Sequence, residues 1–427
     1  MKDELTVGLL GCGVVGSGVV RLLREHADEI AVRLGAHLEL GPVAVRDLRR
    51  TRDVDLPQIT DDPRKVVADP DVDIVVEVMG GLDPARALIT EALEAGKSVV
   101  TANKSLIATA GGDLGTIARR RGVRLEYEAA VAGGVPIIKP MRESLAGDRV
   151  RKVLGILNGT TNYILTRMTD EGASFEAALA EAQRLGYAEA DPSADVTGAD
   201  AAAKTAILAS IAFDAQVTAD DVYTEGITRV TPTDIAHARR MGYVIKLLGI
   251  AEVIDGTVGV RVHPALVPQD HPLANVRDAY NAVFVIGDAA GSLMFYGRGA
   301  GSLPTASAVV GDVVTVARAL LAGERPPLPA PVPLKPVRSF DATTVQSYVL
   351  LDVADEPGVL AGVASAFGAN GVSIRSVWQE GEGDTAQLLL ITHAAREGAV
   401  RATTSALRQL PRVRDVASVM RVEGSEV

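Results

Sequence analysis

The chain has 427 residues, which at about 150 residues per domain predicts two or three domains. Its formal net charge of −11 is the opposite of the basic excess typical of nucleic-acid-binding proteins, so we expect no nucleic-acid partner. The single cysteine, Cys12, excludes an intrachain disulfide and a zinc site built from several cysteines. The N-terminal residues lack a signal-peptide pattern and no run of about 18 apolar residues occurs, so we expect a cytoplasmic protein with no membrane partner.

The N-terminal part alternates short apolar strands with helices. Strands are predicted at Leu5–Leu10, Val43–Val45, Ile74–Val78 and Val99–Thr101. Helices are predicted at Val14–Glu25, Ala85–Ala95 and Leu114–Arg121. This alternation is typical of an α/β fold with a doubly wound parallel sheet.

After about residue 135 the alternation loosens and indicates a second domain of α+β type, which we expect to bind the substrate. Its predicted helices are Phe175–Leu185, Ala199–Phe213 and Asp234–Ala251. Its predicted strands are Val150–Leu157, Thr257–Pro264 and Ala282–Gly287.

Residues 326–336 read PPLPAPVPLKP, with six prolines, and predict a semi-rigid extended linker. A ligand for an SH3-type domain is the less favoured interpretation. The remaining residues are expected to form a small, separate domain of βαββαβ order. Its predicted elements are Tyr348–Val353, Val359–Phe367, Val372–Trp378, Ala386–Thr392, Glu397–Gln409 and Val413–Val422.

The segment Gly11–Gly16 has the pattern G-x-G-x-x-G between the first strand and the first helix. In that context Gly11 would make a tight turn, Gly13 would let the backbone approach a pyrophosphate, and Gly16 would allow close packing of helix and strand. Phosphates favour the N-terminus of a helix because free N–H groups point at them. We therefore expect a dinucleotide here, the alternative being a glycine-rich turn without a ligand.

The end of the second predicted strand suggests which dinucleotide binds. Arg46 comes first, with Arg49 and Arg50 close behind, and an arginine here accommodates the 2′-phosphate of NADP. Asp47 keeps NAD possible, since a carboxylate would bind the ribose hydroxyl instead.

Two lysines are candidates for catalysis. Lys104 follows a strand whose carboxyl end falls at the ligand-binding edge of the sheet. Lys204 lies four residues after Asp200 on a predicted helix with apolar flanks, so the two share a face and the lysine is expected to be buried with its carboxylate partner. Such a lysine can donate a proton. The alternatives are a surface lysine for Lys104 and an ordinary surface ion pair for Lys204.

The segment Ala182–Lys204 resembles the signature of homoserine dehydrogenases. The matching positions are Ala182, Gly186, Tyr187, Asp191, Pro192, Asp195, Val196, Gly198, Asp200 and Lys204. Other segments similar to this family are Gly11–Gly16, Thr101–Lys104, Asn158–Asn162 and Gly297–Gly301. The tail, with its Asp-x-Pro-Gly-Val-Leu turn at Asp355–Leu360, resembles an ACT domain.

These resemblances imply the following architecture. A Rossmann NAD(P)-binding domain spans residues 1–134 and is completed at about 302–325, with Thr305–Leu321 as the returning helix. A substrate-binding and dimerisation domain spans 135–301. The linker at 326–336 then leads to an ACT-like regulatory domain at 337–427.

The resemblance also implies the reaction, a reversible NAD(P)H-dependent reduction of L-aspartate 4-semialdehyde to L-homoserine on the route to threonine, methionine and isoleucine. Lys204 matches the family's proton donor and Lys104 a second active-site lysine. The implied substrate-binding residues are Glu189, Asp200, Lys104, Asp195 and Tyr187. The implied cofactor-binding residues are Gly11, Gly13, Val14, Val15, Gly16, Arg46, Lys104, Gly186 and Gly301.

Two further ligands are implied by resemblance. Glu128, with the carbonyls of Val131, Gly133 and Val135, matches a site for Na⁺, a hard cation that prefers oxygen ligands; an ordinary loop is the alternative. L-threonine is the implied effector of the ACT-like domain, with contacts expected at Asp355, Gly358 and Asn370. ACT domains pair, so a homodimer or homotetramer is expected, although the tail could serve dimerisation alone.

Competing functions are disfavoured by particular residues. A prephenate or phosphoglycerate dehydrogenase would also combine these domains but lacks the Ala182–Lys204 pattern. A non-catalytic amino-acid sensor that retains the fold would be expected to have lost Lys104, Asp200 or Lys204, and all of these are present.

Overall fold

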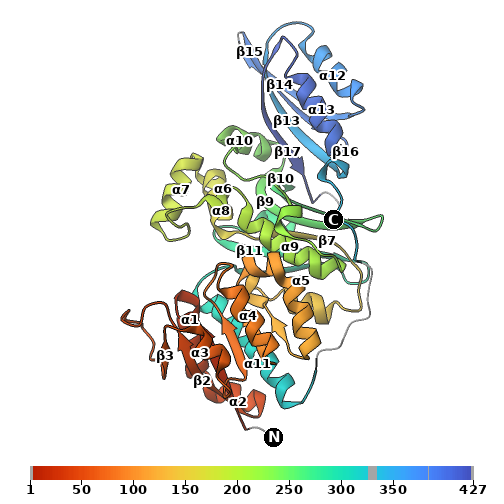
Figure 1. The fold of residues 1–427 in the computed structure, drawn as a ribbon. Helices are drawn as coiled ribbons and strands as arrows, with labels where there is room; N and C mark the ends of the chain where they lie inside the picture. The colour runs from red at the N-terminus through yellow and green to blue at the C-terminus, as the bar shows by residue number, and fades with distance from the viewer. Residues whose placement is uncertain (1–2, 326–333, 383, 425–427) are drawn as a thin grey trace.

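The computed structural model describes residues 3–325, 334–382 and 384–424. Three units follow one another along the molecule, with the N-terminal unit at one end and the C-terminal unit at the other (Figure 1). Most of the residues of the predicted linker lie outside the described residues.

The N-terminal unit is built on a parallel sheet with the strand order β3-β2-β1-β4-β5-β6. The strands are β1 (Glu4–Leu10), β2 (His37–Ala44), β3 (Ile59–Thr60), β4 (Ile74–Glu77), β5 (Ser98–Thr101) and β6 (Leu125–Glu126). The connecting helices are α1 (Val14–Glu25), α2 (Ala27–Leu34), α3 (Pro63–Ala68), α4 (Ala85–Glu94) and α5 (Lys104–Arg121). This is the doubly wound order of dinucleotide-binding domains, as predicted, and its central strands are buried because helices cover both faces.

Helix α11 (Ser302–Leu321) returns from the second unit to pack on α1, β4 and β5. Its length and composition would suit a membrane span, but Ala306, Val309 and Val313 are buried in the core that it shares with β1 and α1. The apolar face of α11 is thus accounted for by packing inside the nucleotide-binding unit.

The second unit places helices on a sheet that is antiparallel except for the short strand β8, which pairs parallel with β10. Its strands are β7 (Val150–Ile156), β8 (Tyr223–Thr224), β9 (Tyr243–Ile254), β10 (Thr257–Pro268), β11 (Tyr280–Gly287) and β12 (Gly291–Arg298). Its helices are α6 (Gly159–Glu171), α7 (Phe175–Arg184), α8 (Ser193–Val196), α9 (Ala199–Phe213) and α10 (Pro232–Arg240). The short helical turns of the chain are η1 (Glu128–Ala130), η2 (Pro140–Ser144), η3 (Ala219–Asp221), η4 (Pro272–Asn275) and η5 (Phe340–Ala342). Helix α9, rich in alanine, packs closely on β7, β9 and β10.

The predicted helix Asp234–Ala251 is wrong in its second half. Helix α10 ends at Arg240, and Gly242, with φ +82°, turns the chain into strand β9. The strand is buried on both faces, so its apolar residues form a continuous run without alternation. Such a run does not distinguish a buried strand from a buried helix.

The C-terminal unit has the predicted βαββαβ order, with one short additional strand. Its elements are β13 (Thr344–Ala354), α12 (Val359–Ala369), β14 (Ile374–Glu382), β15 (Thr385–Thr392), β16 (Ala395–Arg396), α13 (Glu397–Leu407) and β17 (Val413–Val422). The sheet order is β17-β13-β15-β14, and Leu351, Leu388 and Phe367 lie in the core between this sheet and its helices.

The C-terminal unit is joined to the second unit through its last strand. Strand β17 runs back to the second unit and pairs with β10, at Ala265 with Arg421 and Leu266 with Val422 (Figure 1). Beside this pairing, the buried guanidinium of Arg261 lies between the carboxylates of Glu252 and Glu423. The sheets of the second and third units are therefore continuous, a long-range pairing that local sequence patterns do not reveal.

Candidate active site

The glycine turn after β1 has the geometry of a phosphate-binding loop. Gly11 has φ +100°, a conformation that other residues rarely adopt. A Cβ on Gly16 would approach the carbonyl oxygen of Gly11 to 2.2 Å, so only glycine fits there. Gly13 faces open space, and no side chain caps the first N–H groups of α1. These N–H groups are free to bind an anion.

A cavity of about 580 Å³ lies beside this turn. Gly11, Gly13, Arg46 and Asp47 line it, together with Arg50, Arg52 and the Val78–Gly80 turn. The carboxylate of Asp47 accepts a hydrogen bond from the N–H of Arg49 at 2.8 Å and so serves its own loop. Arg46 makes no side-chain hydrogen bond or ion pair with the described residues, which leaves its guanidinium available to a ligand.

The carboxyl ends of β4 and β5 are joined by hydrogen bonds that position Lys104. Thr101 donates to the buried carboxylate of Glu77 at 2.6 Å, and Glu77 also accepts from the N–H groups of Met79 and Gly80. Asn103 caps α5 by accepting from the N–H of Leu106 at 3.1 Å. The side chain of Lys104, 44% exposed, is therefore presented from the first turn of α5.

One carboxylate connects the two predicted catalytic lysines. Asp200, at the start of α9, pairs through Oδ1 with Lys104 of the N-terminal unit and through Oδ2 with Lys204 at 2.7 Å. Nζ of Lys204 also donates to the carbonyl of Leu157 at 2.7 Å. The spacing of four residues thus does place Asp200 and Lys204 together, and the cluster lies where the two units meet.

Burial and charge act together on this cluster. Burial lowers the pKa of Lys204; the carboxylate of Asp200 opposes this effect and the positive charge of Lys104 adds to it, so that the pKa lies below its ordinary value. Burial alone would raise the pKa of Asp200, but the ammonium groups of Lys204 and Lys104 hold it well below its usual range. Asp200 is therefore a permanent anion beside an ammonium that releases its proton more readily than a lysine in water.

Asn158, at the N-cap of α6, fixes the neighbouring carboxylates. Its Nδ2 donates to Asp195 at 2.6 Å and to Asp200 at 2.8 Å, while its Oδ1 accepts from the N–H of Thr161. Because the amide is held from both ends, its orientation is set, and with it the positions of the two carboxylates.

The remaining substrate and cofactor candidates lie in the loop 186–189 and at the turns beside α1 and α11. Tyr187 packs its ring on Tyr163, with centroids 4.9 Å apart, and the side chain of Glu189 is exposed. Gly186, with φ +78°, begins the same loop. Gly301, with φ +121°, precedes Ser302, whose hydroxyl donates to the carbonyl of Val14 at 2.6 Å. The 301–302 turn therefore lies directly against the glycine turn, where Val15 is partly buried.

The predicted metal loop folds around the side chain of Glu128. Its carboxylate accepts from the N–H groups of Ile137, Ile138 and Lys139 at 2.6–2.8 Å. Among the described residues, the main-chain carbonyls of Val131, Gly133 and Val135 accept no hydrogen bond. The carboxylate thus holds the loop together, while buried carbonyl oxygens are left with unused acceptor capacity.

The predicted effector residues are not brought together within one chain. Asp355 and Gly358 lie at the N-terminal end of α12 and Asn370 at its C-terminal end. A helix of this length separates its ends by about 16 Å. A ligand touching all of them would need residues from two copies of the domain.

Sequence reasoning missed Glu77 and Asp312, and it named Asn158 only within a segment similar to the family, without a role. Glu77 could have been noticed as a single charge in an apolar strand, and the role of Asn158 from its place at the N-cap of α6. Asp312 of α11 accepts from the N–H of Glu128 at 2.8 Å and pairs with Lys139, and burial raises its pKa to about 6. No local pattern connects Asp312 to a loop more than 170 residues away.

Comparison with protein families agrees with this geometry. Residues 11–128 match the model described as homoserine dehydrogenase, NAD binding domain, and residues 136–314 match the homoserine dehydrogenase model. Residues 347–412 match the ACT domain model.

Similar proteins span the whole chain. A homoserine dehydrogenase of Mycobacterium tuberculosis is 52% identical over 436 aligned residues, covering 99% of each chain. One of Corynebacterium glutamicum is 48% identical, covering 98% of this chain and 95% of the relative. The crystal structure of a homoserine dehydrogenase from Thiobacillus denitrificans matches with a TM-score of 0.95 at 43% identity, covering 99% of both chains. A hyperthermophilic archaeal homoserine dehydrogenase in complex with NADPH matches with a TM-score of 0.63 at 26% identity, covering 73% of this chain and 97% of that one.

Proposed function

The chain belongs to the homoserine dehydrogenase family of NAD(P)-dependent oxidoreductases, and from this premise we propose how its residues interconvert L-aspartate 4-semialdehyde and L-homoserine. When bound, the reduced nicotinamide supplies a hydride to the aldehyde carbon. Negative charge then develops on the carbonyl oxygen and requires a proton.

Lys204 is the proton donor in this proposal. An ammonium has three N–H groups, and Lys204 uses one on Asp200 and one on the carbonyl of Leu157. The third is available to the substrate oxygen. Its lowered pKa makes the proton easier to release than from a lysine in water, and in the reverse direction the amine takes the proton from the hydroxyl group of homoserine.

Lys104 and Glu189 bind the two ends of the substrate in this proposal. Lys104 is half exposed and held by Asp200, so its ammonium is oriented toward the reacting groups. Glu189 presents an exposed carboxylate from the loop after α7, which suits the ammonium of the amino-acid substrate. Asp195, which Asn158 holds, and Tyr187, which packs on Tyr163, are the further substrate contacts in this proposal.

The observation that carries the proposal is the carboxylate of Asp200, which joins a lysine of the nucleotide-binding unit to a lysine of the second unit. The test is an assay of the purified full chain with aspartate semialdehyde, in which oxidation of NADPH or NADH is followed by absorbance. We expect turnover in both directions. A protein that binds amino acids but leaves both cofactors unoxidised would instead be the non-catalytic sensor.

NADP is the preferred cofactor in this proposal. Arg46 lies at the cavity with a free guanidinium, whereas the carboxylate of Asp47 is occupied by its own loop. A guanidinium binds a 2′-phosphate through charge-assisted hydrogen bonds, and a free carboxylate would be needed to favour NAD.

Na⁺ is proposed to bind the loop that Glu128 organises. The unused carbonyls of Val131, Gly133 and Val135 fit a hard monovalent cation, whereas the carboxylate of Glu128 is already occupied by three N–H groups. The cation would therefore be held by main-chain oxygens. Its role would be to hold the loop next to residues 299–301, on which Gly133 packs.

L-threonine is proposed as an inhibitor that binds between paired ACT domains. The separation of Asn370 from Asp355 and Gly358 within one chain supports a site shared by two copies, and hence a homodimer or homotetramer, in the cytoplasm. A threonine titration of initial rates, with sedimentation analysis of the same samples, tests both parts. Rates that do not respond to threonine would remove this effector.

A further inference from the structure

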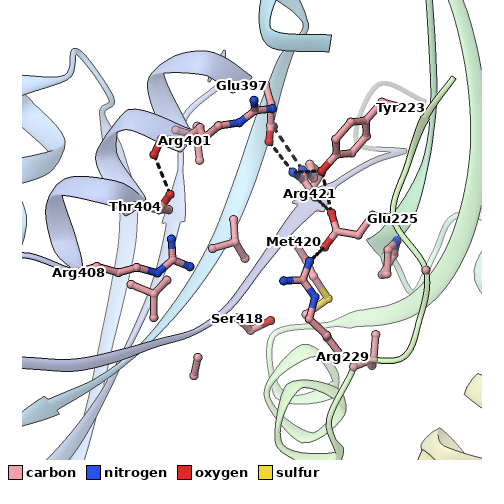
Figure 2. Close-up of a pocket in the computed structure, with 17 residues that line it drawn as sticks. Tyr223, Glu225, Arg229, Glu397, Arg401, Thr404, Arg408, Ser418, Met420 and Arg421 are labelled. Atoms are coloured by element: carbon pink, nitrogen blue, oxygen red, sulfur yellow. Dashed lines mark hydrogen bonds and ion pairs between the residues drawn. The ribbon is translucent and has the colours of Figure 1, made fainter. Parts of the chain in front are cut away.

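A second pocket lies at the junction of the C-terminal and middle units, and the candidate active-site residues are not among its lining residues (Figure 2). It has a volume of about 240 Å³ and is enclosed by α13 and β17 on one side and by residues 223–230 on the other. Asp355, Gly358 and Asn370 are not among its lining residues. We call it the junction pocket.

The carboxylates of the junction pocket are already neutralised. Arg421, 6% exposed, lies between Glu225 and Glu397 and is paired with both, at 2.5 Å in the case of Glu225 (Figure 2). This buried triad connects β17 and α13 to the middle unit and forms one side of the pocket. A ligand would therefore meet little unpaired negative charge.

The guanidinium groups that line the junction pocket outnumber its carboxylates. The described lining holds Arg229, Arg401, Arg408 and Arg421 against Glu225 and Glu397, which is four positive charges against two negative ones. Arg229 and Arg401 are more than half exposed and pair with Glu225 and Asp341. Arg408 makes no side-chain hydrogen bond or ion pair with the described residues. Arginines gathered in this way bind carboxylate or phosphate oxygens.

The pocket is connected to the active site by the segment 223–230. The N–H of Glu225 donates to the carbonyl of Val262, and the N–H of Ile227 to that of Val196 at 2.9 Å. A Cβ on Gly226 would approach the carbonyl oxygen of Val196 to 2.0 Å, so the two segments are in direct contact. Val196 lies four residues before Asp200, the carboxylate that holds both catalytic lysines.

We propose that the junction pocket binds a small dianion, a dicarboxylate or a phosphate, and that its occupancy changes the affinity of the active site for substrate through residues 223–230. The size of the pocket fits such an anion, and the excess of guanidinium groups provides its recognition. This site is separate from the proposed threonine site.

Binding is tested by titration calorimetry of the full chain with succinate and, separately, with inorganic phosphate, at constant ionic strength in chloride. The variants are Arg408→Gln and Arg401→Gln. The matched control is Arg375→Gln, an exposed arginine of the same unit outside the pocket. We expect saturable binding of at least one probe, weakened about tenfold in both pocket variants and unchanged in the control.

The outcomes distinguish the anion and can overturn the site. Binding of succinate alone would identify a carboxylate ligand, and binding of phosphate alone a phosphate ligand. Absence of saturable binding by either probe, or equal binding by all variants, would overturn the site.

Coupling is tested by the KM for homoserine with and without the bound probe. We expect a change of about fivefold or more, absent in Arg408→Gln, whose basal activity should equal that of the unmodified enzyme. An unchanged KM at saturating anion would overturn the coupling. A change that persists in Arg408→Gln would show competition at the active site instead.

Discussion

At Asp200 a single buried carboxylate pairs with two lysines from different units. Because the carboxylate stays ionised, Lys104 and Lys204 can approach each other without the repulsion that two unshielded ammonium groups would feel. The same arrangement lowers the pKa of Lys204 without removing its hydrogen-bond partners. Proton transfer and positioning are thus combined in one group of side chains.

Substitution of Lys204 by alanine should lower kcat by about 10²–10⁴, which is the usual contribution of a positioned general acid. NADPH binding, measured by the fluorescence of the bound nicotinamide, should remain close to that of the unmodified enzyme because the glycine turn is elsewhere. Lys97→Ala, at the opposite end of β5 from Lys104, is the control. Turnover within a few-fold of the original would exclude Lys204 as the donor.

Substitution of Arg46 by alanine should weaken the binding of NADPH far more than the binding of NADH. The guanidinium contacts a 2′-phosphate that NADH does not have, so only one cofactor loses charge-assisted hydrogen bonds. Equilibrium binding of each cofactor measures the difference. An equal loss for both would indicate a change in the fold, and no loss for either would move the phosphate site to Arg49 or Arg50.

Among the elements, the loop 128–139 shows how a charged side chain can organise the backbone around it. The carboxylate of Glu128 accepts hydrogen bonds from three backbone N–H groups. The backbone N–H of Glu128 in turn donates to the carboxylate of Asp312 in the returning helix. The loop is therefore tied to α11, which itself packs on the glycine turn through Ser302. A cation on its free carbonyls would stiffen this connection.

Replacing Na⁺ by choline at equal ionic strength should lower both the activity and the thermal unfolding midpoint, and restoring Na⁺ should recover both. A ligand that binds the folded state stabilises it by mass action. Chloride is constant, so the comparison isolates the cation. Midpoints and rates that are the same in the two salts would rule out a sodium site in this loop.

For the whole molecule, the decisive connection is the one between the second and third units. Strand β17 continues the sheet of the second unit, and Glu423, two residues after Arg421, supplies a carboxylate to the buried Arg261 and Lys152. A chain ending before Val337 would leave Arg261 without this partner. Removal of the tail is thus expected to destabilise the enzyme rather than simply release it from regulation.

Substitution of Glu423 by glutamine should lower the free energy of unfolding by about 3 kcal/mol, as expected for a broken buried ion pair. Glu380→Gln is the matched control, because Glu380 also pairs with an arginine of the second unit but is 59% exposed. Its cost should be much smaller, because water screens an exposed ion pair. Urea denaturation measures both, and equal effects would contradict the importance of burial.

Glu423 should also affect how the free energy of unfolding depends on pH in acid solution. Burial alone would raise the pKa of Glu423, but Arg261 and Lys152 outweigh it and lower the pKa from 4.5 to about 2. A lowered pKa stabilises the fold above the unfolded value, and this stabilisation is lost as pH falls from about 4.5 towards 2. Glu423→Gln should therefore flatten the loss of stability over this range.

Local patterns determined much of this protein. The glycine turn, the spacing of Asp200 and Lys204, the βαββαβ tail and the family signature are each encoded within a few neighbouring residues, where steric limits and helix periodicity act directly. The family and its reaction could therefore be predicted from the order of the amino acids, as could the pairing of Lys204 with Asp200.

Contacts between distant segments were decided by the tertiary structure alone. Four features depend on which surfaces meet after folding: the pairing of Lys104 with Asp200, the support of the loop 128–139 by Asp312, the strand at residues 243–251 and the pairing of β10 with β17. A fully buried strand shows no alternation, and a buried ion pair shows no pattern when its partners are more than 100 residues apart. The sequence thus specifies the chemistry of the site, whereas packing decides how the three units are joined and where the junction pocket forms.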